Sequence, residues 1–270
     1  MSTKERADVA LVRRGLSESR EKAQAQIMAG MVFSQLRKIQ KPSDTVGENE
    51  PLSLKGSVHP FVSRGGLKLE KALDAFEADV KTAVAMDIGA ATGGFTDVLL
   101  RRGASHVYAI DVGYGQLDWE IRKDPRVTVM ERTNARYLKQ EQFEPRPTLT
   151  VMDVSFISIR LILPVAAGIM GDSGRFYTLI KPQFEAGKDR VGKKGVVRDP
   201  SVHEAVLCEI FDFAPTFGYH VQGLTYSPIT GPEGNVEFLA HIAPAQGQYD
   251  AITRENIKKI VEEAHFTLKK

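Results

Sequence analysis

The sequence predicts an α/β protein in which a doubly wound, mostly parallel sheet follows a small N-terminal α+β domain. Three observations support this fold class. Short β-branched or apolar runs alternate with helix-like stretches after residue 63, residues 56–60 (Gly-Ser-Val-His-Pro) have linker composition, and residues 1–41 carry short helical patterns with excess positive charge. A chain of 270 residues can form one sizeable domain and one small one. We therefore expect domains at residues 1–56 and 64–270, joined by a linker at 57–63.

The composition is that of a globular protein with a packed core. The net charge is +2, 42% of the residues are hydrophobic, and a single cysteine, Cys208, excludes an intramolecular disulfide and a cysteine-based zinc cluster. We interpret the protein as cytoplasmic, with Cys208 as a small core residue. The longest nearly apolar run, 161–170, is too short to span a bilayer and contains Pro164, so no membrane segment is predicted. No histidine pair has metal-ligand spacing with supporting carboxylates, so no metal site is expected.

The first domain is predicted to be two short helices against a small sheet. Residues 1–41 contain nine basic and four acidic side chains, a possible phosphate-binding face. Apolar residues recur at helical spacing twice, with Gly15 ending the first helix and Ser17 or Ser19 capping the second. Brief strands are expected at residues 31–33 and 52–54, separated by a turn at 41–44.

The second domain alternates strands with helices. We expect strands at residues 82–88, 106–111, 127–130, 149–153 and 175–180, and helices near residues 94–102, 158–169 and 202–217. This alternation is typical of a parallel sheet covered on both faces. Two late strands, 219–227 and 235–242, have no clear helix between them, which predicts an antiparallel pair at the sheet edge.

The most informative motif is the glycine-rich stretch 87–96 (Asp-Ile-Gly-Ala-Ala-Thr-Gly-Gly-Phe-Thr), between the first strand and its helix. Ligands of open α/β sheets bind at this edge, and glycines allow close backbone approach. The spacing matches neither the dinucleotide nor the nucleoside triphosphate fingerprint, and Asp87 at the strand end disfavours phosphate. Asp111 ends the next strand, where a carboxylate accepts hydrogen bonds from ribose hydroxyls. A nucleoside without phosphate fits, and S-adenosylmethionine is the common one. A tight turn without a ligand is the alternative.

Seven blocks in order, covering nearly the whole chain, resemble the hemolysin-A family: residues 61–69, 87–96, 111–117, 131–136, 153–158, 181–185 and 234–237. The resemblance implies an S-adenosylmethionine-dependent 2′-O-methyltransferase of ribosomal RNA, acting on cytidine, with an FtsJ-like catalytic domain of Rossmann-like fold. It also implies that the N-terminal segment is similar to the RNA-binding fold named after ribosomal protein S-four. The expected partners are ribosomal RNA or ribosomal subunits.

The resemblance also implies site residues. The family's Lys-Asp-Lys-Glu catalytic set matches Lys68, Asp153, Lys181 and Glu237. A lysine acts as a base only when its pKa is lowered, and a second lysine, the cofactor's positive charge and partial burial all contribute to that. We expect Lys181, partnered by Asp153, to be the base, and Lys68 with Glu237 to be positioning groups. The expected cofactor contacts are Asp87, Gly89, Ala90, Thr92, Gly93, Gly94, Phe95, Asp111, Val112, Asn134 and Asp153.

Basic side chains of the N-terminal segment, and of loops near the carboxyl ends of the strands in the second domain, are candidates for RNA contacts. Such groups bind phosphates and confer salt-sensitive affinity rather than sequence choice. We expect Phe156 either to pack near the cofactor or to stack on an extruded base, although a phenylalanine more commonly belongs to the core. The candidate RNA-binding residues are Arg6, Arg13, Arg14, Arg20, Arg132, Arg136 and Lys188.

Two other functions are compatible with the sequence. The first is an RNA-binding ribosome-assembly factor with a vestigial nucleoside pocket, which calorimetry with S-adenosylmethionine would distinguish from an enzyme. The second is membrane lysis, for which the amphipathic stripe at residues 257–268 is the single candidate segment. A helix packed on the domain explains that stripe better.

Overall fold

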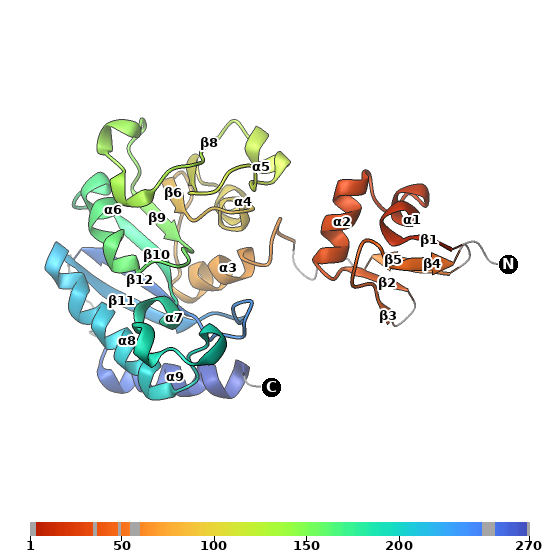
Figure 1. Cartoon of the computed structure of the whole chain (residues 1–270). Helices are drawn as coiled ribbons and strands as arrows, with labels where there is room; N and C mark the ends of the chain where they lie inside the picture. Colours follow the sequence, from red (N-terminus) through yellow and green to blue (C-terminus); the bar gives the residue numbers. More distant parts are fainter. Residues whose placement is uncertain (1–3, 35–36, 48–49, 55–59, 245–251, 269–270) are drawn as a thin grey trace. The chain divides into compact units, whose positions relative to one another are not determined.

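The computed structural model describes residues 4–34, 37–47, 50–54, 60–244 and 252–268 (Figure 1). The chain divides into two compact units, residues 1–60 and 61–270. The division after residue 60 falls within the expected linker at 57–63, of which residues 57–59 lie outside the described ranges.

The first unit consists of two helices and two small antiparallel sheets. Strand β1 pairs with β4, while β2 pairs with both β3 and β5. As predicted, Ser19 caps the second helix, because its hydroxyl accepts a hydrogen bond from the Lys22 N–H at 3.2 Å. The elements are β1 (Lys4–Arg6), α1 (Ala7–Arg13), α2 (Arg20–Met28), β2 (Val32–Ser34), β3 (Arg37–Lys38), β4 (Thr45–Gly47) and β5 (Leu52–Leu54).

The core of this unit is small. Ala7, Ala10 and Leu11 from α1 pack with Ala23 and Ile27 from α2, at the helical spacing seen in the sequence. The buried side chains Val32, Ile39 and Val46 complete the core. Strands β1, β3 and β4 were not predicted because β1 and β3 consist of charged residues and β4 has a single large apolar side chain, Val46, so none of them shows the apolar run that marks β2 and β5.

The second unit is built on a seven-stranded sheet, which confirms the predicted α/β fold class. Its order is β11-β12-β10-β9-β6-β7-β8, and the five strands from β10 to β8 are parallel. Strand β12 is antiparallel to both β10 and β11, so the predicted antiparallel pair lies at one edge. The strands are β6 (Val84–Ile88), β7 (His106–Ile110), β8 (Val127–Met130), β9 (Leu149–Met152), β10 (Arg175–Ile180), β11 (Tyr219–Tyr226) and β12 (Phe238–Pro244).

Helices cover both faces of this sheet (Figure 1). Leu69 and Leu99 lie in the core under α3 and α4, whereas Ala166, Leu207 and Val261 lie in the core under α6, α8 and α9 on the opposite face. The helices are α3 (Gly66–Ala75), α4 (Gly94–Arg101), α5 (Trp119–Lys123), α6 (Leu163–Met170), α7 (Pro182–Glu185), α8 (Pro200–Phe213) and α9 (Arg254–Leu268). The chain runs from β6 towards β8 on one side and from β9 towards β11 on the other, so the switch point lies between β6 and β9. A ligand crevice is expected there.

Prolines and left-handed backbone account for several shifted boundaries. Thr82 has φ +61°, so the first strand begins at Val84 rather than at residue 82. The expected helix 158–169 is a 3₁₀ turn (Ile159–Leu161) followed by α6, in which Pro164 lies in the first turn. The expected helix 202–217 ends at Phe213, and a 3₁₀ turn containing Pro215 follows.

Candidate active site

The glycine loop after β6 adopts a conformation that requires glycine. Gly89 has φ +86°, and a Cβ there would lie 2.7 Å from the Asp153 carbonyl oxygen, so the loop contacts the end of β9 directly. Gly93, with φ +92°, immediately precedes α4. The loop therefore sits at the switch point between β6 and β9.

Asp87 supports this loop from behind and does not line a cavity. It is fully buried, and its Oδ2 accepts a hydrogen bond from the Thr96 hydroxyl at 2.7 Å. Among the described residues, its Oδ1 has no hydrogen-bond partner. Burial raises the pKa of Asp87 to about 7. The expectation that Asp87 contacts the cofactor directly therefore has no support from its position.

A cavity of about 320 Å³ opens between the glycine loop and the ends of β7 and β9. Asp111 follows β7, and its two carboxylate oxygens accept hydrogen bonds from the N–H groups of Ala91, at 2.8 Å, and Gly113, at 2.7 Å. This bridging fixes the rim of the cavity and leaves each oxygen a second lone pair. The expected cofactor residues that line this cavity are Gly89, Asp111, Val112, Asn134 and Asp153.

A second cavity of about 330 Å³ shares Gly89, Ala91, Asp153 and Ser155 with the first one. Its walls bring together the four expected catalytic residues and much of the glycine loop. The expected residues that line it are Lys68, Gly89, Ala90, Thr92, Gly94, Phe95, Asp153, Lys181 and Glu237. Gly93 lines neither cavity. It immediately precedes α4 and forms the N-terminal cap of that helix.

Two lysines and two acids form a continuous chain of ion pairs in the second cavity. The Lys68 Nζ lies 2.6 Å from the Glu237 Oε2 and 3.5 Å from the Asp153 Oδ2. The Lys181 Nζ lies 2.6 Å from the Asp153 Oδ1 and donates to the Ser155 hydroxyl at 2.9 Å. The Lys68 and Glu237 side chains are only 8% and 2% exposed. When all four groups are ionised their charges cancel, so this buried cluster is compensated.

The four residues come from separate parts of the fold. Lys68 lies on α3, Asp153 follows β9, Lys181 follows β10, and Glu237 precedes β12. Because β9 and β10 are parallel neighbours, Asp153 and Lys181 emerge at the same edge of the sheet. The antiparallel strand β12 enters the sheet beside β10 from that edge, which places Glu237 there as well.

Among the residues of the second cavity that were not assigned from the sequence, two have side chains that form hydrogen bonds there. Ser155 accepts a hydrogen bond from Lys181, and Arg64 donates a hydrogen bond to the Thr230 carbonyl at the cavity wall. Both belong to blocks that resemble the hemolysin-A family, at 153–158 and 61–69. Their place next to Asp153 and Lys68 in the sequence is the signal that could have identified them.

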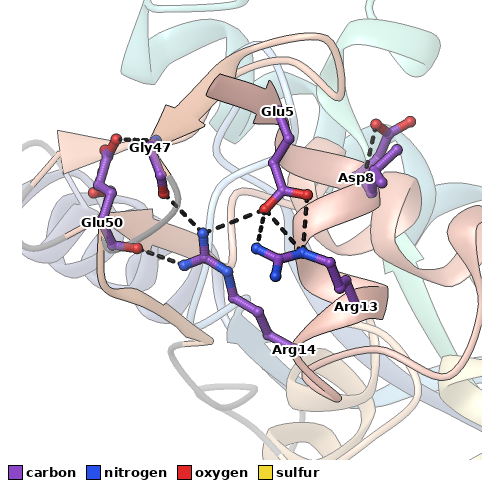
Figure 2. Close-up of polar contacts among 8 residues, drawn as sticks. Glu5, Asp8, Arg13, Arg14, Gly47 and Glu50 are labelled. Carbon is purple, nitrogen blue, oxygen red and sulfur yellow. Dashed lines mark hydrogen bonds and ion pairs between the residues drawn. The ribbon is translucent and has the colours of Figure 1, made fainter. Parts of the chain in front are cut away.

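Two of the candidate RNA-binding residues of the first unit, Arg13 and Arg14, are held by an acidic partner and by carbonyl groups. The Arg14 guanidinium donates to the carbonyls of Gly47 and Glu50, and the Arg13 Nε lies 3.1 Å from a Glu5 carboxylate oxygen (Figure 2). Arg14 therefore links β1, β4 and the following loop, and its side chain is mostly buried.

Arg6 and Arg20 share one buried acid. The fully buried Asp8 accepts hydrogen bonds from the Arg6 Nε at 2.9 Å, the Arg20 Nε at 3.0 Å and the Gln24 amide at 2.9 Å. The Arg6 hydrogen bonds contribute most to holding the pKa of Asp8 well below its usual range. Both arginine side chains are about half exposed, so their outer N–H groups remain available to a ligand.

In the second unit, Arg136, Phe156 and Lys188 line a groove of about 740 Å³ that shares Phe156 and Ile157 with the first cavity. Phe156 is 92% exposed, has φ +64°, and packs its ring against Phe184 at 5.2 Å between centroids. The general expectation of a core position for Phe156 is therefore wrong. Arg132, with φ +53°, places its guanidinium 4.2 Å from the Tyr114 ring centroid.

The remaining side chains with possible chemistry have structural positions. Within the described ranges, no group of three or more His, Cys, Asp or Glu side chains converges as metal ligands would. Cys208 is partly buried and packs against the core, and His203 contacts His265 at 2.8 Å between α8 and α9. None of the helices in the described part of the chain has the length and apolar character that a membrane crossing needs.

Comparison with known proteins identifies the family. The family model described as FtsJ-like methyltransferase matches residues 61–243, which include the glycine loop and all four residues of the ion-pair chain. The chain belongs to the FtsJ-like methyltransferase family. The Rossmann-like fold class expected from the resemblance is thus confirmed.

Relatives of this FtsJ-like methyltransferase cover nearly its whole length. It is 52% identical to the "Putative rRNA methyltransferase YqxC" of Bacillus subtilis, over 99% of this chain and 96% of that protein. It is 44% identical to the "16S/23S rRNA (cytidine-2'-O)-methyltransferase TlyA" of Mycobacterium tuberculosis, over 94% and 98%. The solved structure "Putative hemolysin from Streptococcus thermophilus" is 45% identical, covers 100% of this chain and 98% of that one, and superposes with a TM-score of 0.78. These relatives confirm the resemblance to the hemolysin-A family.

Proposed function

We propose that this FtsJ-like methyltransferase transfers a methyl group from S-adenosylmethionine to the 2′-hydroxyl of a cytidine in ribosomal RNA. The ion-pair chain of Lys68, Glu237, Asp153 and Lys181, beside the glycine-loop cavity, carries this proposal. The printed name of the Mycobacterium tuberculosis relative, a cytidine-2'-O-methyltransferase, supports the nucleotide and the reacting hydroxyl.

The first cavity fits the nucleoside part of the cofactor. Asp111 offers carboxylate lone pairs to ribose hydroxyls, and the exposed Val112 offers apolar surface to the base. Gly89 and Ala91 line both cavities, so the backbone of the glycine loop can follow the ligand from one cavity to the other. When bound, S-adenosylmethionine supplies a methyl group on a positively charged sulfur, and this charge suits a site that contains Asp111 and Asp153.

Lys181 is the proposed general base. A ribose hydroxyl is a weak acid, so a positioned group that accepts its proton accelerates the reaction. Lys181 pairs with one carboxylate, that of Asp153, whereas Lys68 lies near two, those of Glu237 and Asp153. Lys181 is therefore the less engaged of the two amines, and we assign it the role of base.

Lys68 and Glu237 are the proposed positioning groups. The buried Lys68–Glu237 pair at 2.6 Å fixes the Lys68 ammonium beside the Asp153 carboxylate. Lys68 thus holds Asp153, and Asp153 with Ser155 aims the Lys181 amine. A base held within hydrogen-bond reach of the hydroxyl lowers the entropic cost of reaction.

The first unit is proposed to be an S-four-like RNA-binding domain. Arg6 and Arg20 present half-exposed guanidinium groups on it, and Arg136 and Lys188 line the groove beside Phe156 in the second unit. Such cations bind phosphates. The exposed Phe156 ring is suited to stacking on a base that has been turned out of its helix.

The test compares Lys181→Met with Lys81→Met, a surface control at the opposite end of the sheet. Tritiated methyl transfer is measured on ribosomal subunits from cells lacking the gene, and the modified ribose is mapped. We expect Lys181→Met to lower the rate by about 10²–10⁴-fold, with calorimetric affinity for S-adenosylhomocysteine unchanged. A rate near that of the wild type would refute the role of Lys181. Absence of methyl incorporation by the wild type would refute the function and favour an assembly factor.

A further inference from the structure

The segment that follows Asp153, residues 154–157, lies outside the helices and strands, and we call it the β9 loop. Among the residues that the structure describes, the β9 loop forms no backbone–backbone hydrogen bond. Val154 and Ile157 pack against the core, whereas Phe156 is 92% exposed with a left-handed φ of +64°. Such a conformation persists where the surrounding contacts hold it. The attachments at the two ends of the loop therefore set the position of Phe156.

One end of the β9 loop is attached to the turn after β10 through the active site. The Lys181 Nζ lies 2.6 Å from the Asp153 Oδ1 and donates to the Ser155 hydroxyl at 2.9 Å. Lys181 directly follows β10, and α7 begins at the next residue. The position of Ser155 therefore decides where the Lys181 amine points.

The other end is attached to the same turn by a buried carboxylate. Glu185 ends α7 and is 5% exposed. Its Oε2 accepts a hydrogen bond from the Ser158 hydroxyl at 2.6 Å, and its Oε1 accepts one from the Ile159 N–H at 2.8 Å. The Arg160 guanidinium lies 3.5 Å from the Oε2 and donates to the Glu185 carbonyl at 3.3 Å. Both carboxylate oxygens thus hold the segment that follows the β9 loop.

Charge compensation alone does not account for a buried acid at this position. Arg160 already has a surface partner, Glu209, whose Oε2 lies 3.5 Å from its guanidinium and whose side chain is 37% exposed. Burial disfavours the carboxylate and raises the pKa of Glu185, against the opposing effect of its hydrogen bonds. An acid here therefore costs free energy that a neutral side chain would not. In return it accepts two directed hydrogen bonds, from Ser158 and Ile159.

We propose that Glu185 is a positioning residue that holds the β9 loop against the turn after β10 and so fixes Ser155 beside Lys181. Phe156 lies between the two attachments, and its ring packs against Phe184 of the same turn at 5.2 Å between centroids. The same attachment therefore fixes the exposed ring next to the catalytic residues. This inference rests on the proposed function, because it assigns Glu185 to the step in which Lys181 accepts a proton.

Glu185→Gln and Glu185→Met test this role. Glutamine keeps the shape of the side chain, can accept the Ile159 N–H and can donate to the Ser158 hydroxyl, whereas methionine replaces neither bond. With ribosomal subunits as substrate, we expect Glu185→Met to lower kcat about 10- to 100-fold and Glu185→Gln to stay within about threefold of the wild type. Glu209→Gln, which changes the exposed acid beside Arg160, is the control and should leave kcat unchanged.

A spectroscopic measurement that needs no catalysis reports on the β9 loop itself. 4-Trifluoromethylphenylalanine is incorporated at position 156 of the full chain, and its ¹⁹F resonance is recorded. We expect one narrow line with Glu185 or Glu185→Gln, and a broadened or divided line with Glu185→Met. Ser158→Ala, which removes one of the two hydrogen bonds, should broaden the line less and lower kcat about 3- to 10-fold.

The stoichiometry of S-adenosylhomocysteine binding in calorimetry counts the folded molecules, and kcat is expressed per binding site. Three results overturn the proposal: kcat of Glu185→Met at the wild-type level, an unchanged ¹⁹F line in that variant, or an equal loss in Glu185→Gln, since the last result points to charge alone. If Glu185→Met does not fold, wild-type kcat in Ser158→Ala overturns the proposal.

Failure of the proposed function is distinguishable from failure of this inference. A wild-type protein that methylates no RNA refutes the function. A broadened ¹⁹F line in Glu185→Met would still support the attachment of the β9 loop by Glu185, because the resonance is recorded without substrate.

Discussion

Replacing Glu237 with glutamine is expected to destabilise the catalytic unit, because it leaves the Lys68 ammonium buried without its closest carboxylate. The Lys68 and Glu237 side chains are 8% and 2% exposed, and their charged atoms are 2.6 Å apart. Removing one partner of a buried ion pair costs about 3–5 kcal/mol. Asp153 lies 3.5 Å from the same ammonium and compensates part of the loss, which favours the lower end, about 3 kcal/mol.

For a unit of residues 61–270, each 1 kcal/mol of destabilisation lowers Tm by about 2–4 °C. The expected decrease for Glu237→Gln is therefore about 6–12 °C. The double variant Lys68→Met/Glu237→Gln no longer buries an uncompensated charge, so it should recover at least half of this decrease. Methyl transfer should be lost in both variants, which separates the stabilising role of the pair from its role in positioning.

Differential scanning calorimetry of the full chain measures both effects. Glu209→Gln is the matched control, because Glu209 pairs with Arg190 at 2.8 Å but is 37% exposed, and such a surface pair contributes about 0–1 kcal/mol. If Glu237→Gln melts within 2 °C of the wild type, or if the double variant is no more stable than the single one, Lys68 does not depend on Glu237 and the reasoning fails.

Gly89→Ala should weaken S-adenosylhomocysteine binding at least tenfold in calorimetry, because its Cβ would lie 2.7 Å from the Asp153 carbonyl. Gly218→Ala has a similar φ, +85°, with open space around it, so equal losses in both variants would contradict this explanation. Asp87→Asn tests the buried acid: its folded pKa of about 7 exceeds the unfolded value near 4, so its protonation favours folding and wild-type stability falls as pH rises from about 4 through 7. Asparagine does not titrate and so removes this decline, and the Tm of Asp87→Asn relative to that of the wild type should rise between pH 5 and pH 8. If the Tm values of the two proteins change in parallel over this range, the raised pKa of Asp87 is excluded.

The sheet of the second unit was predictable because its parallel strands are buried on both faces. Runs such as 106–110 and 175–180 consist almost entirely of apolar or β-branched residues, so they stand out from the polar loops between them. The missing helix between 219–226 and 238–244 likewise revealed the antiparallel pair. Boundaries were less predictable, since Thr82 and Pro215 act through backbone conformation rather than hydropathy.

Other features depend on tertiary contacts that the sequence does not display. Helix α3 was not predicted, although Leu69, Ala72 and Leu73 show helical spacing, because it begins at Gly65 and Gly66 without a side-chain cap that would mark its start. Lys68 and Glu237 are 169 positions apart, and only the resemblance, not any spacing, indicated that they meet. Phe156 is exposed because a left-handed backbone turns it away from the core, which no hydropathy pattern encodes.

The buried Asp8 carboxylate has a consequence for how an anion would bind to the first unit. Its hydrogen bonds to Arg6 and Arg20 restrict two long side chains that would otherwise sample many rotamers. Immobilising such a side chain costs up to about 2 kcal/mol of conformational entropy. Because folding has already imposed this cost, a phosphate group that docks on the two arginines meets a rigid pair of donors and forgoes little of its binding energy to order them.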